Sequence, residues 1–246
     1  MQITIDGLVL RGRALAEDRA LTILTAEKGL ITAFANKTGT MRSKLAASTE
    51  ALCYSRFVLF HHRGRTVVDK ADSNHIFFGI RGDYGKLCLA SYFAQLAAEL
   101  LAQDEPAAEP LRLMLNALHY LEAGSRDQRI LKPLFELRLL TLAGFMPDLV
   151  GCRYCSEYEG GDMYFFPQEG DIACAGCCRG EAPAGGACLS AGVLAAMRHI
   201  IYAPVARLFS FSLGEAGLEE LGRVSERYLL SKAERGFSAL ELYKNG

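Results

Sequence analysis

The sequence lacks an apolar run long enough to cross a membrane. No stretch approaches the roughly 18–20 consecutive apolar residues that a membrane-spanning helix needs. The first residues also lack the basic region, apolar run and small-residue cleavage site of an export signal. We therefore expect a cytoplasmic protein with no membrane partner. In that reducing compartment the eight cysteines are expected to be free thiols or metal ligands rather than disulfides.

An excess of charge of one sign is missing as well. The chain has 27 Lys and Arg against 28 Asp and Glu, a net charge of −1, which argues against a uniformly basic nucleic-acid-binding coat. The balance shifts along the chain, because residues 1–80 hold 11 basic and 7 acidic side chains whereas residues 81–246 hold 16 and 21. This asymmetry predicts an N-terminal part that meets an anion.

Common catalytic motifs are also absent. The chain contains no H-E-x-x-H, G-x-x-x-x-G-K-[ST], G-x-S-x-G or G-x-G-x-x-G, and no H-x-E followed by P-C-x-x-C. His61 and His62 are neighbours beside an expected strand tip, where adjacent side chains point to opposite faces, so a surface role is favoured over a metal site. We therefore expect that the protein is not an enzyme.

Five short segments in the first 79 residues have the pattern of β-strands. They are rich in apolar, aromatic and β-branched residues and cover about 3–10, 20–25, 29–35, 52–60 and 66–76. Ala26–Gly29 has the composition of a hairpin connection. Five strands in this length predict a small closed barrel, and an oligonucleotide-binding (OB) barrel has this size. An SH3-like barrel is the alternative that periodicity leaves open.

From about residue 80 the apolar period becomes helical. Expected helices cover 84–101, 110–122, about 132–143, 190–202 and 218–235. Pro133 predicts that the third of these helices either begins or kinks near Lys132. Residues 151–188 interrupt them with six of the eight cysteines and eight glycines. The fold class is thus α+β and multidomain: an N-terminal OB-fold β-barrel over 1–79, a mostly α-helical domain over 80–150 and 189–246, and an embedded cysteine-rich insert over 151–188.

The cysteines of the insert have the spacing of a structural zinc site. Cys152 and Cys155 form one C-x2-C knuckle, and Cys174 and Cys177 form another after 18 intervening residues. Two tight turns of this kind aim four thiolates at one tetrahedral Zn²⁺ and leave no position for a catalytic water. Cys178 is an alternative to Cys177. Redox dithiols or inert thiols are the other interpretations of the set.

Basic residues of the first 79 positions are candidates for nucleic-acid contact. Lys37, Arg42 and Lys44 share one polar loop, and a second group flanks the expected strands: Arg11, Arg13, Arg63 and Arg65. Such a face beside Phe34, Tyr54 or Phe57 is suited to follow a phosphodiester backbone and stack bases. Ordinary solvated charges and core aromatics are the alternative.

Several blocks resemble the RecO family of bacterial recombination mediators. Gly7–Arg11 and Leu24–Ile31 are similar to the family's opening strands, and Lys37 with Ser43–Leu45 is similar to its basic loop. The most specific block is Phe135–Leu149, which leads into Cys152, and Tyr164, Phe165, the second knuckle and Leu189–Ser190 follow in the family's order.

The resemblance implies an OB domain, a helical body and a zinc ribbon that act without catalysis in recombinational repair at the nucleoid. It implies binding of single- and double-stranded DNA, strand annealing, and cooperation with RecR in loading RecA onto strands coated by the single-strand-binding protein SSB. By position, the resemblance implies that the family's DNA-binding loop corresponds to Lys37, Arg42 and Lys44. It implies that the family's metal ligands correspond to Cys152, Cys155, Cys174 and Cys177. The docking site of the SSB C-terminal tail lies in the family's helical body and is not transferred by residue.

Two departures and two alternatives accompany this interpretation. The basic loop is diluted by Thr38, Thr40 and Met41, and Pro133 and Leu134 stand where the family commonly has arginine. The first alternative function is a zinc-ribbon interaction or scaffold protein without direct single-strand binding. The second is a nucleic-acid enzyme of a kind that its motifs do not reveal.

Overall fold

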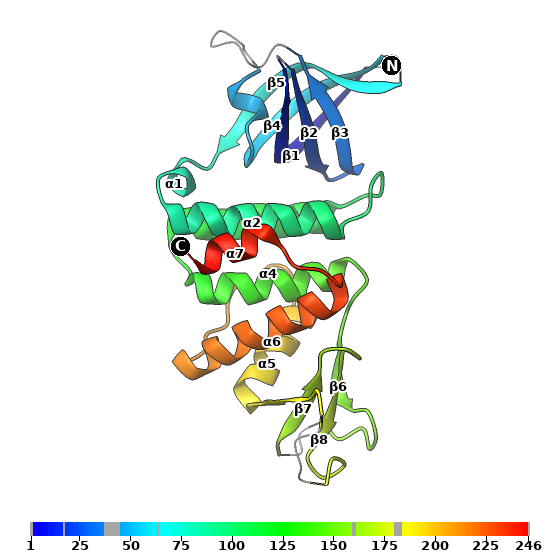
Figure 1. Cartoon of the computed structure of the whole chain (residues 1–246), viewed down its shortest axis with the longest axis vertical. Coiled ribbons are helices and arrows are strands. Elements are labelled where there is room, and N and C mark those ends of the chain that lie inside the picture. The colour runs from blue at the N-terminus through cyan, green and yellow to red at the C-terminus, as the bar shows by residue number, and fades with distance from the viewer. Residues whose placement is uncertain are drawn as a thin grey trace. The chain divides into compact units, whose positions relative to one another are not determined.

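The computed structural model describes residues 2–16, 18–36, 45–62, 64–158, 161–179 and 184–245 (Figure 1). The chain divides into two compact units. The first unit comprises Met1–Ser125 with Phe237–Gly246, and the second comprises Arg126–Gly236. The three-part division expected from the sequence stays a prediction, because compactness alone does not show which parts fold independently.

The first unit contains a five-stranded closed barrel. Its strands are β1 (Gln2–Leu15), β2 (Asp18–Thr25), β3 (Gly29–Ala35), β4 (Cys53–His62) and β5 (Arg65–Ile76). They are ordered β1-β2-β3-β5-β4, and antiparallel pairing of β1 with β4 closes the ring. The β3–β5 pair is parallel, which gives the Greek-key arrangement of an OB barrel. The expected OB-like domain is confirmed.

Alternating side chains fill the barrel. The interior cluster combines residues from all five strands: Ile5, Val9, Leu21, Ile23, Ala33, Ala35, Phe57, Leu59, Val68 and Ala71. Phe57 is fully buried in this cluster. The expectation that Phe57 stacks on bases is therefore wrong, because its position in the strand alternation turns the ring inward.

Four helices complete the first unit. They are α1 (Phe78–Arg81), α2 (Tyr84–Leu100), α3 (Ala108–Ala123) and α7 (Ser238–Lys244). The Asp83 side chain caps α2 by accepting from the Lys86 N–H, and Gly124 ends α3 in the left-handed conformation expected of a glycine there. Helix α7 packs along α2, where the Ala239 N–H donates to Gln95 Oε1 at 2.9 Å (Figure 1).

The second unit packs three helices with a small sheet. Its helices are α4 (Gln128–Leu142), α5 (Ala191–Tyr202) and α6 (Glu215–Ala233). Helix α4 begins at Gln128, so the expected start near Lys132 is wrong. Asp127 caps the earlier start by accepting from the Arg129 N–H at 2.8 Å, and the helix tolerates Pro133 inside it. The missing N–H of Pro133 removes only one bond of the helical ladder.

The cysteine-rich insert is a four-stranded sheet. Strands β6 (Asp148–Cys152), β7 (Met163–Phe166), β8 (Asp171–Cys174) and β9 (Ala187–Leu189) are ordered β6-β8-β7-β9. The antiparallel β7–β8 pair forms a hairpin between the two cysteine knuckles. In the described part of the chain, no helix is both long enough and apolar enough to cross a membrane.

Candidate metal centre and nucleic-acid interface

Strand topology brings the two cysteine knuckles together. Cys152 ends β6 and Cys174 ends β8, and these strands pair in parallel, so both chain segments enter their knuckle turns at the same edge of the sheet. The Sγ atoms of Cys152, Cys155, Cys174 and Cys177 all lie within 4.8 Å of one another. The Sγ atoms of Cys155 and Cys174 are 3.6 Å apart. This is a compact set of four sulfur donors.

The backbone of the knuckles favours negative charge on Cys152. Burial raises the pKa of this thiol, but the backbone N–H groups of Cys174, Cys155 and Tyr154 outweigh burial and lower the pKa to about 6. The Tyr154 N–H lies 3.4 Å from the Cys152 Sγ. The pKa of Cys177 is raised, chiefly by hydrogen bonds with the thiols of Cys155 and Cys174. The backbone therefore favours the thiolate form of Cys152, whereas the neighbouring thiols oppose it at Cys177.

The donor set fits a structural Zn²⁺ ion. Four sulfurs in mutual contact match a closed tetrahedral thiolate site and do not match hard, oxygen-preferring cations. Among the described cysteines this cluster includes Cys177 and excludes its neighbour Cys178. Outside the cluster, Cys53 and Cys88 are buried, and Cys188 is exposed.

Two arginines that sequence reasoning overlooked brace the cluster. Arg153, inside the first knuckle, pairs with Asp171 at 3.0 Å and stacks over the Phe166 ring at 4.1 Å from its centre. Arg198 on α5 donates to the carbonyls of Leu149 at 2.7 Å and Tyr158 at 3.0 Å. The position of Arg153 inside C-x2-C was a usable signal. Arg198 lies 43 residues beyond Cys155, so no local sequence pattern linked it to the cysteines.

The candidate nucleic-acid residues divide into two groups. Lys37, Arg42, Lys44 and Arg63 lie outside the described residues. Arg11 and Arg13 are two residues apart on β1, so their side chains lie on the same face of the strand, and both are exposed. Arg65 begins β5, and its guanidinium lies 5.1 Å from the centre of the Phe34 ring. The structure therefore gives one expected pairing of a cation with an aromatic ring on the barrel surface.

Some arginines of the barrel pair with a carboxylate, and others do not. Arg56 forms a two-pronged pair with Asp6, with bonds of 2.8 and 3.0 Å, and Arg19 pairs with Glu50 at 2.8 Å. Within the described residues, Arg11, Arg13 and Arg65 form no ion pair; Arg11 Nε donates to Thr22 Oγ1 at 3.2 Å. The charge of these three arginines is available to an external anion.

Models of known protein families match residues in both units. The family model for the N-terminal part of recombination protein O matches residues 1–76, and the model for its C-terminal part matches residues 81–241. The chain belongs to the RecO family. The RecO models together span the barrel, the helices and the insert, so the resemblance seen in separate sequence blocks is confirmed over nearly the whole chain.

Individual RecO relatives match at similar length. The DNA repair protein RecO of Acetivibrio thermocellus is 32% identical over 240 residues, which cover 97% of this chain and 95% of that protein. The DNA repair protein RecO of Symbiobacterium thermophilum is 29% identical over 242 residues, or 96% and 94% of the two chains. The DNA repair protein RecO of Heliobacterium modesticaldum is 30% identical over 245 residues, or 96% and 88% of the two chains.

The block with the most specific RecO resemblance carries a buried ionic network. Glu136 on α4 is fully buried and lies 2.8 Å from the ammonium of Lys132, one helical turn earlier. The Ser225 hydroxyl donates to the same carboxylate at 2.6 Å, and Lys132 also pairs with Glu226 at 3.0 Å. The network joins α4 to α6 inside the second unit.

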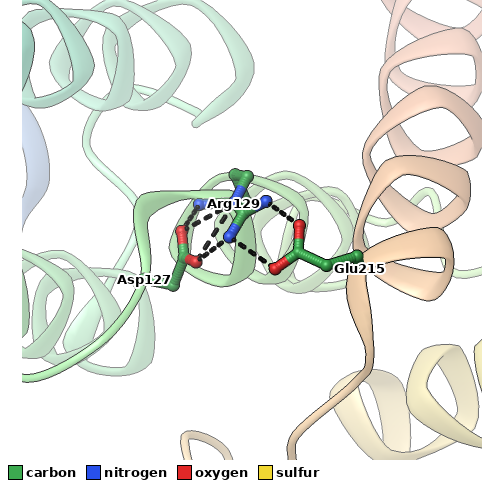
Figure 2. A network of polar contacts seen from close by, with 3 residues as sticks. All are labelled: Asp127, Arg129 and Glu215. Carbon is green, nitrogen blue, oxygen red and sulfur yellow. Dashed lines mark hydrogen bonds and ion pairs between the residues drawn. The ribbon is translucent and has the colours of Figure 1, made fainter.

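An exposed network joins the first turns of the same two helices. Figure 2 shows the guanidinium of Arg129 between the carboxylates of Asp127 and Glu215. Arg129 Nη2 lies 2.7 Å from Asp127 Oδ2 and 3.2 Å from Glu215 Oε1. Asp127 also caps α4, and the arginine holds the pKa of that carboxyl below its usual range. Arg129 is therefore engaged in contacts that link the starts of α4 and α6.

Proposed function

We propose that this protein is a DNA repair and recombination mediator that binds single- and double-stranded DNA through its barrel. It promotes annealing of complementary strands and, with RecR, helps RecA to load onto strands coated by SSB. The relatives described above are DNA repair proteins by name. The observation that carries the proposal is the OB-ordered barrel with exposed arginines that no described acid neutralises. The site of action is the nucleoid in the cytoplasm.

Cationic contacts explain how such a barrel works on DNA of any sequence. Arginine contacts to phosphates release condensed counterions and fix the strand without reading bases. Annealing requires two strands held close with their charges screened, and no bond is made or broken. We therefore propose a role without catalysis. Arg11, Arg13 and Arg65, with the loop residues Lys37, Arg42 and Lys44 and the strand-tip residue Arg63, supply the cations.

We also propose that Cys152, Cys155, Cys174 and Cys177 hold one structural Zn²⁺. When bound, the ion would stabilise the two knuckles against each other. The chain itself supplies the turns that aim the sulfurs, the N–H groups that favour the Cys152 thiolate, and the bracing by Arg153 and Arg198. A preformed frame of this kind lowers the conformational cost of binding the metal.

The proposal is tested by binding of a fluorescent single-stranded oligonucleotide over a salt series. We expect binding that weakens steeply with salt. A Lys37→Ala/Arg42→Ala/Lys44→Ala variant and an Arg11→Ala/Arg13→Ala/Arg65→Ala variant should each have a shallower slope of log Kd against log salt. The slope should fall by about 0.7 for each phosphate that the variant no longer neutralises. Arg56→Ala is the matched control, because Asp6 already neutralises that exposed arginine.

The outcomes separate the functions. Equal slopes for wild type and both triple variants would place the DNA site elsewhere. Absence of binding by wild-type protein with zinc bound would contradict direct single-strand binding and favour the scaffold function. Addition of purified RecR to that sample then decides whether binding requires the partner.

A further inference from the structure

The barrel has an open seam. Strands β3 and β5 share one registered pair, Phe34 with Val67, whereas the neighbouring strand pairs run over most of their length. A cavity of about 560 Å³ opens beside the start of β3, between that strand and the residues around the β4–β5 turn. Its volume lies in the range of roughly 300–1,000 Å³ found for small-molecule sites.

The cavity has an apolar floor and a polar rim. Leu59 belongs to the interior cluster of the barrel, the partly buried Ile3 and Ile31 pack against that cluster, and all three line the cavity. The rim is formed by more polar side chains together with one ring: Lys28, Phe60, His61, Thr66, Gln103 and Asp104. An apolar body with polar groups at the mouth suits a flat, partly polar ligand group.

The wall contributed by the α2–α3 connection is held in place. The Asp104 N–H donates to the Leu30 carbonyl at 3.3 Å, and Gln103 forms bridges with Gly29 and Leu30. The Ala107 N–H donates to the Ala26 carbonyl at 2.9 Å. The cavity is therefore shaped before a ligand arrives, which reduces the ordering cost of binding.

The charge around the cavity favours an anionic chain. Lys28 lies on the rim, and Arg65 directly precedes the rim residue Thr66, whereas Asp104 is the one carboxylate among the described lining residues. Thr32 lines the cavity and, two residues later, Phe34 lies beneath the Arg65 guanidinium. An aromatic ring and an arginine with no acidic partner among the described residues thus border the opening, and both residue types are used by sites for single-stranded nucleic acid.

We propose that this seam cavity receives one unpaired base of single-stranded DNA while Lys28 and Arg65 contact the flanking phosphates. The inference rests on the proposed DNA binding and deepens it. Bases of a duplex are stacked and paired, and extruding one costs free energy. The cavity therefore gives the barrel a preference for single strands that phosphate contacts alone do not provide.

A ligand series tests the proposal without altering the protein. Binding of a thymine oligonucleotide, an oligonucleotide of equal length made of abasic units, and a duplex is compared at one salt concentration. Removal of the bases should weaken wild-type binding about 10-fold, the order expected for loss of a stacked base. Equal affinity for the thymine and abasic strands would overturn the proposal while leaving phosphate-based DNA binding intact.

A filled cavity provides the second measurement. Thr32→Met/Thr66→Met places two non-aromatic side chains in the opening, and Thr4→Met is the control on an exposed β1 position outside the lining. We expect the double variant to bind single strands about 10-fold more weakly, to discriminate little between thymine and abasic strands, and to bind duplex within about 2-fold of wild type. The control should match wild type.

Other outcomes also decide. Unchanged single-strand binding by a folded double variant overturns the cavity proposal alone. Absence of DNA binding by wild-type protein overturns both this proposal and the proposed function. A last outcome concerns an acidic peptide that contains phenylalanine. If this peptide binds wild type but not the double variant, and the DNA affinity of the variant is unchanged, the cavity is a site for a protein ligand. That result would overturn the proposal that the cavity receives a base.

Discussion

At the scale of single residues, the arginines and lysines of this chain have separate tasks that their type does not reveal. Arg129 and Arg56 each have carboxylate partners, and Lys132 is buried between Glu136 and Glu226. A buried ion pair contributes little net stability by itself, but removal of one partner leaves the other charge in a medium of low dielectric. The burial of a charged side chain, more than the sign of its charge, therefore decides how much folding stability is lost when it is removed.

Lys132→Met should strongly destabilise the protein. The substitution removes the cation beside the fully buried Glu136, and uncompensated burial of a carboxylate costs about 3–5 kcal/mol. The free energy of unfolding from urea titration is the measurement. Arg129→Ala serves as the matched control on the same helix, and it should cost far less because solvent screens its exposed network. Equal losses in the two variants would contradict the buried-network interpretation.

At the scale of elements, the cluster of four cysteines is a product of strand pairing. Parallel alignment of β6 with β8 delivers two knuckles to one edge, although 18 residues separate them in the sequence. The second knuckle turns so that Cys174 and Cys177 join the cluster, while Cys178 and the exposed Cys188 stay outside it. Geometry thus resolves an ambiguity between adjacent cysteines that spacing leaves open.

Cys177→Ser should abolish stoichiometric zinc binding, whereas Cys178→Ser should retain it. A serine hydroxyl is a poor replacement for a thiolate ligand, and loss of one ligand from a four-sulfur site leaves it incomplete. Elemental analysis of the purified variants, supported by release of metal to a colorimetric chelator, gives the zinc content per chain. Zinc retained in Cys177→Ser and lost in Cys178→Ser would reverse the ligand assignment.

At the scale of the whole molecule, the two units are expected to depend on zinc to different degrees. The cysteine cluster belongs to the second unit, and the barrel belongs to the first. Because the energy of binding a structural metal is also folding energy, metal removal should act mainly on the unit that contains the ligands.

Removal of zinc with a strong chelator should lower the melting temperature of the second unit by roughly 10 °C or more, as expected for loss of several kcal/mol. Affinity for single-stranded DNA should stay within about 2-fold, because the proposed contacts lie on the barrel. Calorimetry and the oligonucleotide assay on the same sample check both statements. A parallel loss of DNA binding would show that the insert contributes to the DNA site.

Local patterns predicted much of this fold, and long-range contacts account for what they missed. The alternating segment Ala20–Thr25 predicted a strand, and C-x2-C spacing predicted the cysteine cluster. The inward position of Phe57 follows from strand register, which composition alone does not fix. The network of Lys132 with Glu226 joins residues 94 positions apart, so no local pattern contains it.

The packing of α7 against α2 has a consequence for protein synthesis. Phe237 is buried against Tyr92, with ring centres 6.2 Å apart, yet 111 residues of the second unit are translated between the two parts of the first. At about 5–20 residues per second, roughly 5–20 seconds pass before α7 emerges. During that interval the face of α2 that Phe237 and α7 cover in the finished protein stays without its cover on the ribosome-bound chain.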